Sequence, residues 1–196
     1  MALMATAMIS CNGNNQNSIF PAGCELRTGD IVFRRGGGIS SHAVMMADIN
    51  GRYSHVGIVV DSAGKKMIVH AVPGEPDFEG DPDRVKMDTP EKFFSVTNAN
   101  AGEVKRLRGD TLTPIKAAAF AMEIYRRYTL FDHDYDDSDT TKMYCCEIVE
   151  FAYAKAGRSL AGTVRHDIKL PGLNAFHCML PSDICNSKLL ISIIDF

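Results

Sequence analysis

The sequence predicts an α+β protein with a mainly antiparallel sheet. Short apolar segments bounded by turn residues recur between residues 29 and 107, and helical patterns group around 113–127 and 145–157. Several strands with helices grouped between them are typical of α+β folds. A chain of 196 residues that is 45% hydrophobic and 23% charged is long enough for one compact domain with a sizeable core.

The first half of the chain supplies most of the expected strands. A turn at Gly29-Asp30 leads into a short strand at 31–33, and the triple glycine at 36–38 ends it. This glycine run lacks the Gly-Lys-Ser/Thr ending of a phosphate loop, so we interpret it as a flexible rim or a plain turn. Ser40 or Ser41 is a candidate cap for a short helix through Asp48. Further strands are expected at 53–60, 66–72, 84–88 and 103–107, with a helical turn near 90–94.

The second half is mainly helical. Thr113-Pro114 predicts the start of a helix that runs to about Arg127, because a capping hydroxyl precedes a proline whose missing N–H costs nothing there. The acidic loop at 132–139 lacks the sixth-position glycine and twelfth-position glutamate of a calcium loop, so we interpret it as a solvated loop or site rim. The remaining elements are expected in this order: a helix from Cys145 that Gly157 ends, a short helix from Pro181, and a buried last strand at 189–194.

The N-terminus resembles the end of a bacterial lipoprotein signal peptide. Residues 1–10 are uncharged and mostly apolar, and they precede Cys11 and a polar stretch at 12–18. We therefore expect residues 1–25 to be a signal remnant and tether, and residues 26–196 to be the folded domain. The protein is then expected in the cell envelope, in contact with a membrane only through a lipid on Cys11. An ordinary frayed arm is the alternative, since the usual positively charged start is missing.

Charge and cysteine usage exclude several function classes. The formal net charge is −3 and no basic run occurs, so we expect no nucleic-acid partner. The six cysteines form no C-x-x-C pair, and we expect neither a metal nor a cofactor. Cys178 and Cys185 could form a disulfide in an oxidising compartment, or they could be buried free thiols.

Two segments carry the candidate catalytic chemistry. His55 lies on an expected strand, and Cys145 lies where a helix is expected to begin. A thiol attacks carbonyl groups well only as a thiolate, and a helix N-terminus with a nearby imidazole lowers the cysteine pKa from about 8.5. The two residues are therefore a candidate nucleophile and general base.

A second histidine could orient the first. If Val60 and Lys65 close a hairpin over residues 61–64, then His55 and His70 lie directly opposite each other on the same face of the sheet. His70 could then hold the His55 ring in the tautomer that accepts a thiol proton. This expectation depends on the register of the two strands.

Helical spacing favours Cys145 over Cys146 as the nucleophile. Positions three, four, seven and eleven residues after Cys145 are all apolar, so this side of the helix is expected to face the sheet and His55. The same count from Cys146 gives a mixed face. A buried structural thiol is the alternative reading of Cys145, and a zinc site formed with the two histidines would match no standard spacing. The other four histidines, at positions 42, 133, 166 and 177, are expected to be surface or loop residues.

These motifs together resemble a known family. The segments 29–33 and 54–58, the acidic aromatic stretch before Tyr144-Cys145, and Glu147 resemble the permuted papain-like amidases of the YaeF/YiiX type, which are relatives of the NlpC cell-wall endopeptidases. The resemblance covers the chain from about Leu26. It implies a circularly permuted papain-like fold with a small antiparallel sheet or barrel packed against helices, in which the base precedes the nucleophile along the chain. It also implies Cys145 as nucleophile and His55 as base.

The sequence thus predicts a cysteine amidase or peptidase that uses Cys145, His55 and His70. By analogy, its substrates are expected to be peptides of the cell envelope, of the peptidoglycan type. A lipid-directed hydrolase or acyltransferase with the same site is one alternative, and an apolar groove beside the thiol would favour it. A binding module that has lost catalysis is the other alternative.

Overall fold

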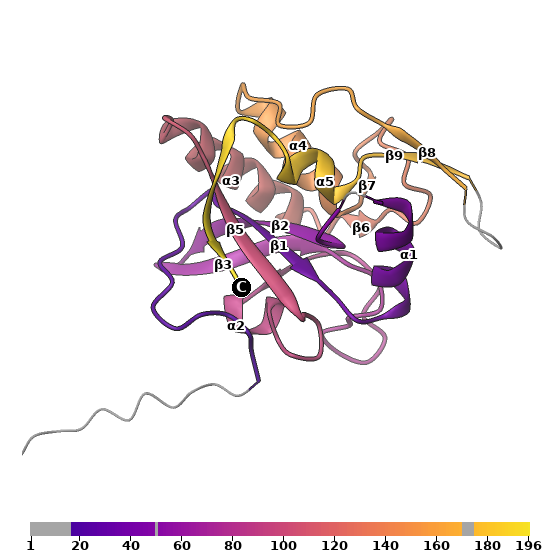
Figure 1. Cartoon of the computed structure of the whole chain (residues 1–196), viewed down its shortest axis with the longest axis horizontal. Coiled ribbons are helices and arrows are strands. Elements are labelled where there is room, and N and C mark those ends of the chain that lie inside the picture. Colours follow the sequence, from indigo (N-terminus) through magenta and orange to yellow (C-terminus); the bar gives the residue numbers. More distant parts are fainter. Residues whose placement is uncertain (1–16, 50, 170–174) are drawn as a thin grey trace, which may run out of the picture.

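A six-stranded antiparallel sheet forms the centre of the protein (Figure 1). The computed structural model describes residues 17–49, 51–169 and 175–196. The strand order is β10-β5-β1-β2-β3-β4, so the last strand of the chain lies at one edge and β4 lies at the other. The bounds are β1 Ile31–Arg35, β2 His55–Ser62, β3 Lys65–Ala71, β4 Val85–Asp88, β5 Ala101–Leu107 and β10 Leu190–Asp195.

Helices cover both faces of the sheet. α3 (Leu112–Arg126) and α4 (Cys145–Lys155) lie together on one face, and the short α2 (Pro90–Phe93) lies on the other (Figure 1). The protein is therefore a mixed α+β structure with an antiparallel sheet packed against helices, as the sequence predicts. The remaining elements are α1 Ile39–Ala47, α5 Pro181–Cys185, the pair β6 Leu130–Phe131 with β7 Lys142–Met143, and the pair β8 His166–Ile168 with β9 Phe176–Cys178.

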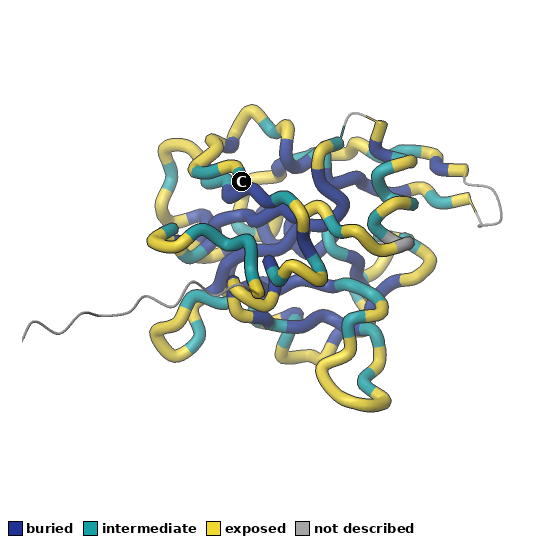
Figure 2. The backbone as a smooth tube through the Cα atoms, turned by 60° about the horizontal axis from the view of Figure 1, so that its bottom comes forward, coloured by how far each residue is buried: buried dark blue, intermediate teal, exposed yellow. Residues whose placement is uncertain are grey.

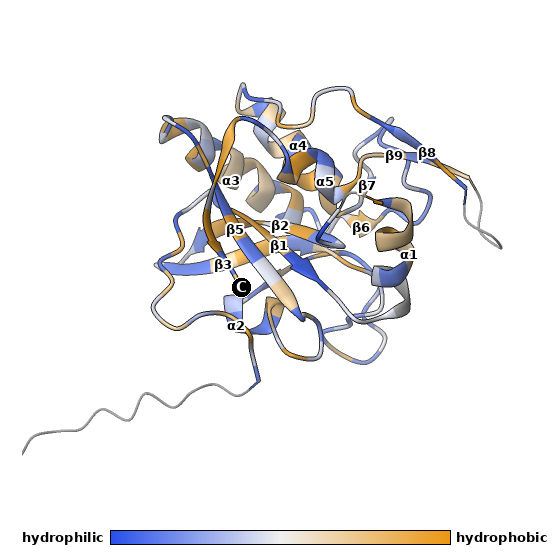
Figure 3. Ribbon diagram, in the orientation of Figure 1, coloured by the Kyte–Doolittle hydropathy of each residue, from blue (hydrophilic) through white to orange (hydrophobic). Residues whose placement is uncertain are grey.

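The alternation of apolar side chains along the strands builds two cores. Val56, Ile58 and Val60 of β2 face the helices α3 and α4, whereas Val59 packs with Phe93 on the opposite face. Successive side chains of a strand point to opposite faces, so one strand can supply both cores. The central strands are accordingly buried along most of their length and strongly apolar (Figures 2 and 3).

The register of β2 and β3 differs from the expected register by two residues. Ser62 pairs with Lys65, and the two-residue turn Ala63-Gly64 closes the hairpin with φ angles of 52° and 78°. Positive φ at both central positions is the mark of a tight hairpin turn whose twist matches the strands. The expectation of a four-residue loop was therefore wrong. A shift of two residues nevertheless leaves every side chain on its expected face, because the period of a strand is two.

Two element details also differ from expectation. α3 begins at Leu112, and the carboxylate of Asp110 accepts the N–H groups of Leu112 and Thr113, so Asp110 does the capping that we expected of Thr113. β10 forms as predicted, but Ile191 and Ile193 are 37% and 38% exposed because the strand is at the sheet edge. The expectation that this strand is buried was wrong.

The start of the described chain lies against the domain. Ile19 donates its N–H to the carbonyl of Phe94, and Phe20 stacks on the Phe94 ring at a centroid distance of 5.5 Å. Cys11 and the rest of the expected signal remnant up to residue 16 lie outside the described residues. Within the described residues, the structure contains no helix with the length and apolar character required to cross a bilayer.

Gly57 provides a test of how tightly β2 and β3 pack. A Cβ at this position would lie 2.6 Å from Ile68 Cγ2 and 3.2 Å from His70 Cβ. Gly57→Ala should therefore lower the free energy of unfolding by roughly 1–3 kcal/mol through overpacking. Gly37→Ala is the matched control, because nothing lies within 4 Å of its Cβ. Urea unfolding of both variants measures the difference, and equal stabilities would contradict the packing described here.

Candidate functional site

The site begins with two histidines on the same face of the sheet. His55 is the first residue of β2, and His70 lies near the end of β3. Their ring nitrogens, His55 Nε2 and His70 Nδ1, are 2.9 Å apart, and both side chains are buried. Because the strands are offset from the expected register, the two rings meet diagonally rather than directly across the pair.

Asp88 extends this pair into a chain of three groups. It ends β4, and its Oδ2 lies 3.0 Å from His70 Nε2. A carboxylate can only accept, so His70 carries its proton on Nε2 and offers Nδ1 as an acceptor. His55 then donates Nε2–H to His70, which leaves His55 Nδ1 unprotonated. Asp88 thus fixes the tautomers of both rings.

Charge pairing keeps Asp88 ionised. Burial would raise the pKa of the Asp88 carboxyl, but the hydrogen bonds from His70 and Lys92 outweigh this effect, and the pKa falls below its usual range. Lys92 Nζ lies 2.8 Å from Asp88 Oδ1 and also pairs with Asp77. A buried carboxylate with two donors is a stable acceptor for His70.

Aromatic packing fixes the orientation of the two rings. Phe93, from α2, lies with its centroid 5.6 Å from the His55 ring and 5.0 Å from the His70 ring. The guanidinium of the buried Arg34 lies over the Phe93 ring, 4.7 Å from its centroid, and donates a hydrogen bond to the backbone carbonyl of Phe93. Phe93 therefore packs against both histidine rings at once.

Both histidines are held neutral by burial. Loss of solvation lowers the pKa of His55 to about 4 and also lowers the pKa of His70. The positive charge of Arg34 acts in the same direction on both rings. A neutral His55 keeps Nδ1 unprotonated and available as a hydrogen-bond acceptor.

Cys145 reaches this system from the other face of the sheet. It is the first residue of α4, and its half-buried side chain lies where β2 begins. The neighbouring thiol of Cys146, the imidazole of His55 and the backbone N–H of Val56 lower the pKa of the Cys145 thiol well below its usual range, although burial opposes them. The helix N-terminus favours negative charge at the same point. The Cys145 thiol therefore loses its proton more readily than an ordinary cysteine.

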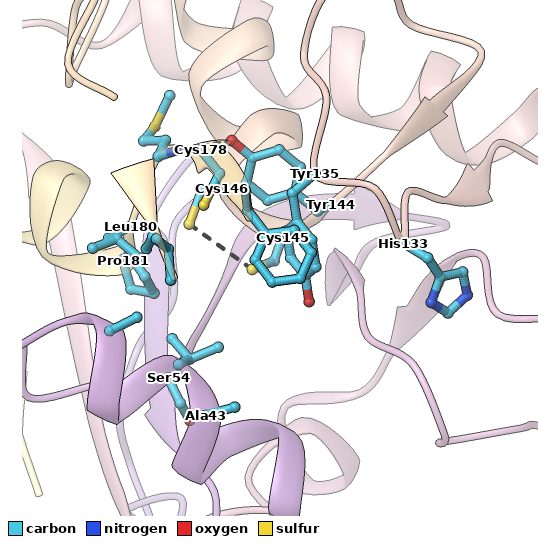
Figure 4. A pocket seen from close by; sticks show the side chains of 15 residues that line it. Ala43, Ser54, His133, Tyr135, Tyr144, Cys145, Cys146, Cys178, Leu180 and Pro181 are labelled. Atoms are coloured by element: carbon cyan, nitrogen blue, oxygen red, sulfur yellow. Dashed lines mark hydrogen bonds between the residues drawn. The ribbon is translucent and has the colours of Figure 1, made fainter. Parts of the chain in front are cut away.

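Some of the residues singled out in the sequence meet at one site, and others lie away from it. Cys145, His55 and His70 come together. Cys146 is buried beside Cys145, with the two sulfurs 3.9 Å apart (Figure 4). Cys178 and Cys185 are free, buried thiols, whose burial raises each pKa to about 11. The other four histidines are exposed or half-buried, as predicted, at positions 42, 133, 166 and 177.

The sequence analysis missed Asp88 as a site residue. The strand at 84–88 was predicted, but nothing in its pattern shows that its last residue contacts His70. A carboxylate that directly precedes the helix start Thr89-Pro90 was the available signal, and it is a weak one because acidic residues are common near helix starts. The contact depends on the register of β3 and β4, in which His70 pairs with Lys86.

A cavity of about 320 Å³ opens beside Cys145 (Figure 4). One wall is the apolar face of α1, and another comes from β8, β9 and the start of α5. Among the described residues, no Lys, Arg, Asp or Glu side chain lines this cavity. Its apolar lining includes Ala43, Val44, Ala47, Ile168, Phe176 and Leu180.

Comparisons with known proteins identify the fold. No protein-family model matches the chain, and no curated protein matches it. The structure is similar to the crystal structure of the metalloprotein YiiX from Escherichia coli O157:H7, with a TM-score of 0.68 and 19% sequence identity. The match covers 88% of this chain and 99% of that chain. The protein therefore has a YiiX-type fold, and at this identity the likeness shows the fold alone.

YiiX is described as a metalloprotein, which raises the question whether the residues of this chain fit a metal. In the described ranges, no group of three or more His, Cys, Asp or Glu side chains is arranged to hold a metal ion. His70 has both ring nitrogens engaged, by His55 and Asp88. The residues present do not fit a bound metal, and we derive no chemical step through one.

The reactivity of Cys145 tests the hydrogen-bonded chain. At pH 7, iodoacetamide should modify Cys145 at least about ten-fold faster than Cys178 or Cys185, because only Cys145 has a lowered thiol pKa. Asp88→Asn should slow this labelling about ten-fold, since an amide no longer fixes the His70 tautomer. Asp77→Asn is the control, because Asp77 shares Lys92 but is not hydrogen-bonded to His70. Equal labelling rates in the two variants would exclude the proposed role of Asp88.

The lowered pKa of His55 also predicts a pH dependence of stability. His55 titrates at about 4 in the folded protein and near 6.5 when unfolded, so between these values the unfolded chain binds more protons. Stability should therefore fall as the pH falls from about 6.5 to 4, with about 3 kcal/mol from this ring. His55→Asn should flatten the curve, whereas His133→Asn, at an exposed ring, should not. Urea titrations at several pH values measure the slopes, and an unchanged slope in His55→Asn would refute the assignment.

Proposed function

We propose that the protein is a cysteine hydrolase of the permuted papain-like type, in which Cys145 attacks the carbonyl carbon of an amide or ester. The observation that supports this proposal best is the hydrogen-bonded series from Asp88 through His70 to His55, beside which Cys145 lies with a lowered thiol pKa. A nucleophile, a base and an orienting group within hydrogen-bond reach form the arrangement that activates a thiol. Here the orienting group is itself a histidine, fixed by Asp88.

The proposed reaction uses His55 Nδ1 as the proton carrier. The thiol proton of Cys145 passes to this nitrogen as the sulfur bonds to the carbonyl carbon and negative charge develops on the oxygen. The backbone N–H of Cys145, which has no intrahelical partner at the first helical position, is the proposed donor to this oxyanion. His55 then protonates the leaving nitrogen or oxygen, and the acyl group remains on sulfur. A water molecule that gives its proton to the same nitrogen releases the acid.

The lining of the cavity favours an apolar acyl group in the substrate. Its walls beside Cys145 are built from aliphatic and aromatic side chains, and the described residues contribute no charged partner for a peptide carboxylate or amine. An acyl chain that enters such a cavity is stabilised by about 0.8 kcal/mol for each CH₂ group that it buries. A lipid ester or an N-acyl amide is therefore the substrate class that we propose, with hydrolysis or transfer of the acyl group as the reaction.

Cell-envelope peptides are the substrates that the sequence resemblance implies. The same nucleophile and base would cleave these peptides, but the cavity offers few polar and no Lys, Arg, Asp or Glu side chains among the described residues to bind them. The envelope location itself remains a proposal, because it depends on lipidation of Cys11. A lipid anchor there would place the domain close to lipid substrates as well as to the cell wall.

Capture of the acyl-enzyme tests both the reaction and the substrate class. The protein is mixed at neutral pH with p-nitrophenyl octanoate, p-nitrophenyl acetate or a muramyl peptide, quenched in acid, and measured by intact-mass spectrometry. We expect an octanoyl adduct on Cys145 that Cys145→Ala abolishes. Ala43→Leu should lower kcat/KM for octanoate about ten-fold and for acetate less than two-fold, because Ala43 lines the cavity.

The other outcomes separate the alternatives. An adduct with the muramyl peptide but not with octanoate would overturn the lipid class and favour the peptidase. Absence of any adduct, with Cys145 still reactive toward iodoacetamide, would favour a binding module. A Cys185→Ser variant controls for adducts on a buried thiol outside the cavity lining.

A further inference from the structure

Three free cysteines surround the cavity beside α4. Cys145, Cys146 and Cys178 all line it (Figure 4). Cys145 is half-buried and reachable from the cavity, whereas Cys146 and Cys178 are 1% and 5% exposed. The catalytic proposal uses only the first of these thiols. The second lies 3.9 Å from it, sulfur to sulfur.

We propose that Cys145 and Cys146 form a reversible oxidation site, in which a peroxide oxidises Cys145 and the neighbouring Cys146 captures the product as a disulfide. The proposal rests on the proposed function only in that both use the ionised sulfur of Cys145. It assigns to Cys146 a role that the hydrolysis reaction does not require. The disulfide would protect the nucleophile from irreversible oxidation and would stop acyl transfer until a thiol reduces it.

The chemistry needs one peroxide and no other co-reactant. The Cys145 thiolate attacks one oxygen of the peroxide, the O–O bond breaks, and the sulfur becomes a sulfenic acid while the second oxygen leaves as water or alcohol. The sulfur of Cys146 then attacks the Cys145 sulfur. The S–OH bond breaks, the hydroxyl group takes the thiol proton and leaves as water, and an S–S bond forms. The pair of cysteines loses two electrons and the peroxide gains them.

Oxidation of Cys145 itself activates Cys146. Burial raises the pKa of the Cys146 thiol, and the hydrogen bond to Cys145 and its negative charge raise it further. Cys146 is therefore protonated and inert while Cys145 is a thiolate. Conversion of Cys145 to a neutral sulfenic acid removes the contribution of its negative charge to the raised pKa of Cys146, while the contribution of burial stays.

The position of the pair at the helix start allows the bond to form. Cys145 and Cys146 are the first two residues of α4, where backbone N–H groups have no intrahelical partners. Dihedral changes at these two residues therefore break no intrahelical hydrogen bond donated by their own N–H groups. Adjacent residues have Cα atoms about 3.8 Å apart, less than the roughly 4.4–6.8 Å of ordinary disulfides. The bond would be strained and hence easily reduced, as suits a reversible modification.

Cys178 is the competing partner. Among the cysteines of the described ranges, only Cys146 has its sulfur within hydrogen-bonding distance of the Cys145 sulfur. Burial raises the thiol pKa of Cys178 and of Cys146 alike, so the short distance between the sulfurs is the observation that favours Cys146.

Peptide mapping distinguishes the partners without any substrate. The full-length protein is treated with hydrogen peroxide, blocked with iodoacetamide and digested with trypsin. Cys145 and Cys146 share the tryptic peptide 143–155, whereas Cys178 and Cys185 share the peptide 170–188. We expect peptide 143–155 to become two hydrogens lighter, and dithiothreitol treatment before blocking to restore both thiols. Cys146→Ser should instead accumulate Cys145 sulfinic acid at least about five-fold faster than the wild type, and Cys178→Ser should behave like the wild type.

Two outcomes would overturn the inference. One is sulfinic acid on Cys145 at the same rate in the wild type and in Cys146→Ser, and the other is a disulfide that joins peptides 143–155 and 170–188. Neither outcome affects the proposed hydrolase, which requires only an acyl-enzyme on Cys145. Conversely, a reversible disulfide within peptide 143–155 in a protein that forms no acyl-enzyme would support this inference and count against the hydrolase.

Discussion

The site depends on one buried carboxylate. Asp88 can only accept hydrogen bonds, so it dictates where His70 carries its proton, and His70 in turn dictates the tautomer of His55. The basic nitrogen of His55 is thereby left free for Cys145. Burial of both rings lowers their pKa values and so favours the neutral form, and Phe93 packs against both rings. In the proposed hydrolase, two neutral imidazoles thus take the place of one histidine with an acid or amide.

Much of the fold could be predicted because local pattern and turn chemistry agree along the chain. The strands, the helix that Cys145 begins and the stop at Gly157 follow from periodicity and capping. The register of β2 and β3 was harder to predict, because a four-residue turn and a two-residue turn both fit the same hairpin sequence. The error of two residues was harmless to the site, since it left His55 and His70 on one face. An error of one residue would have separated them.

Asp88 and the exposure of β10 could not be predicted for a different reason. Both depend on which strands are neighbours in the sheet, and that is set by packing over the whole domain. A long connection at 72–84 separates β3 from β4, so no local signal fixes their pairing. The apolar segment at the C-terminus predicts a strand equally well at the centre or at the edge. Only the strand order shows that β10 ends the sheet.

The two halves of the site belong to different layers of the molecule. His55 and His70 lie on the sheet face that carries Phe93, whereas Cys145 belongs to the helix layer on the opposite face, and they meet only where β2 begins. Their alignment therefore survives only while α4 stays docked. A substitution that shifts α4 relative to the sheet would therefore separate the Cys145 sulfur from the His55 ring even if both layers stayed folded.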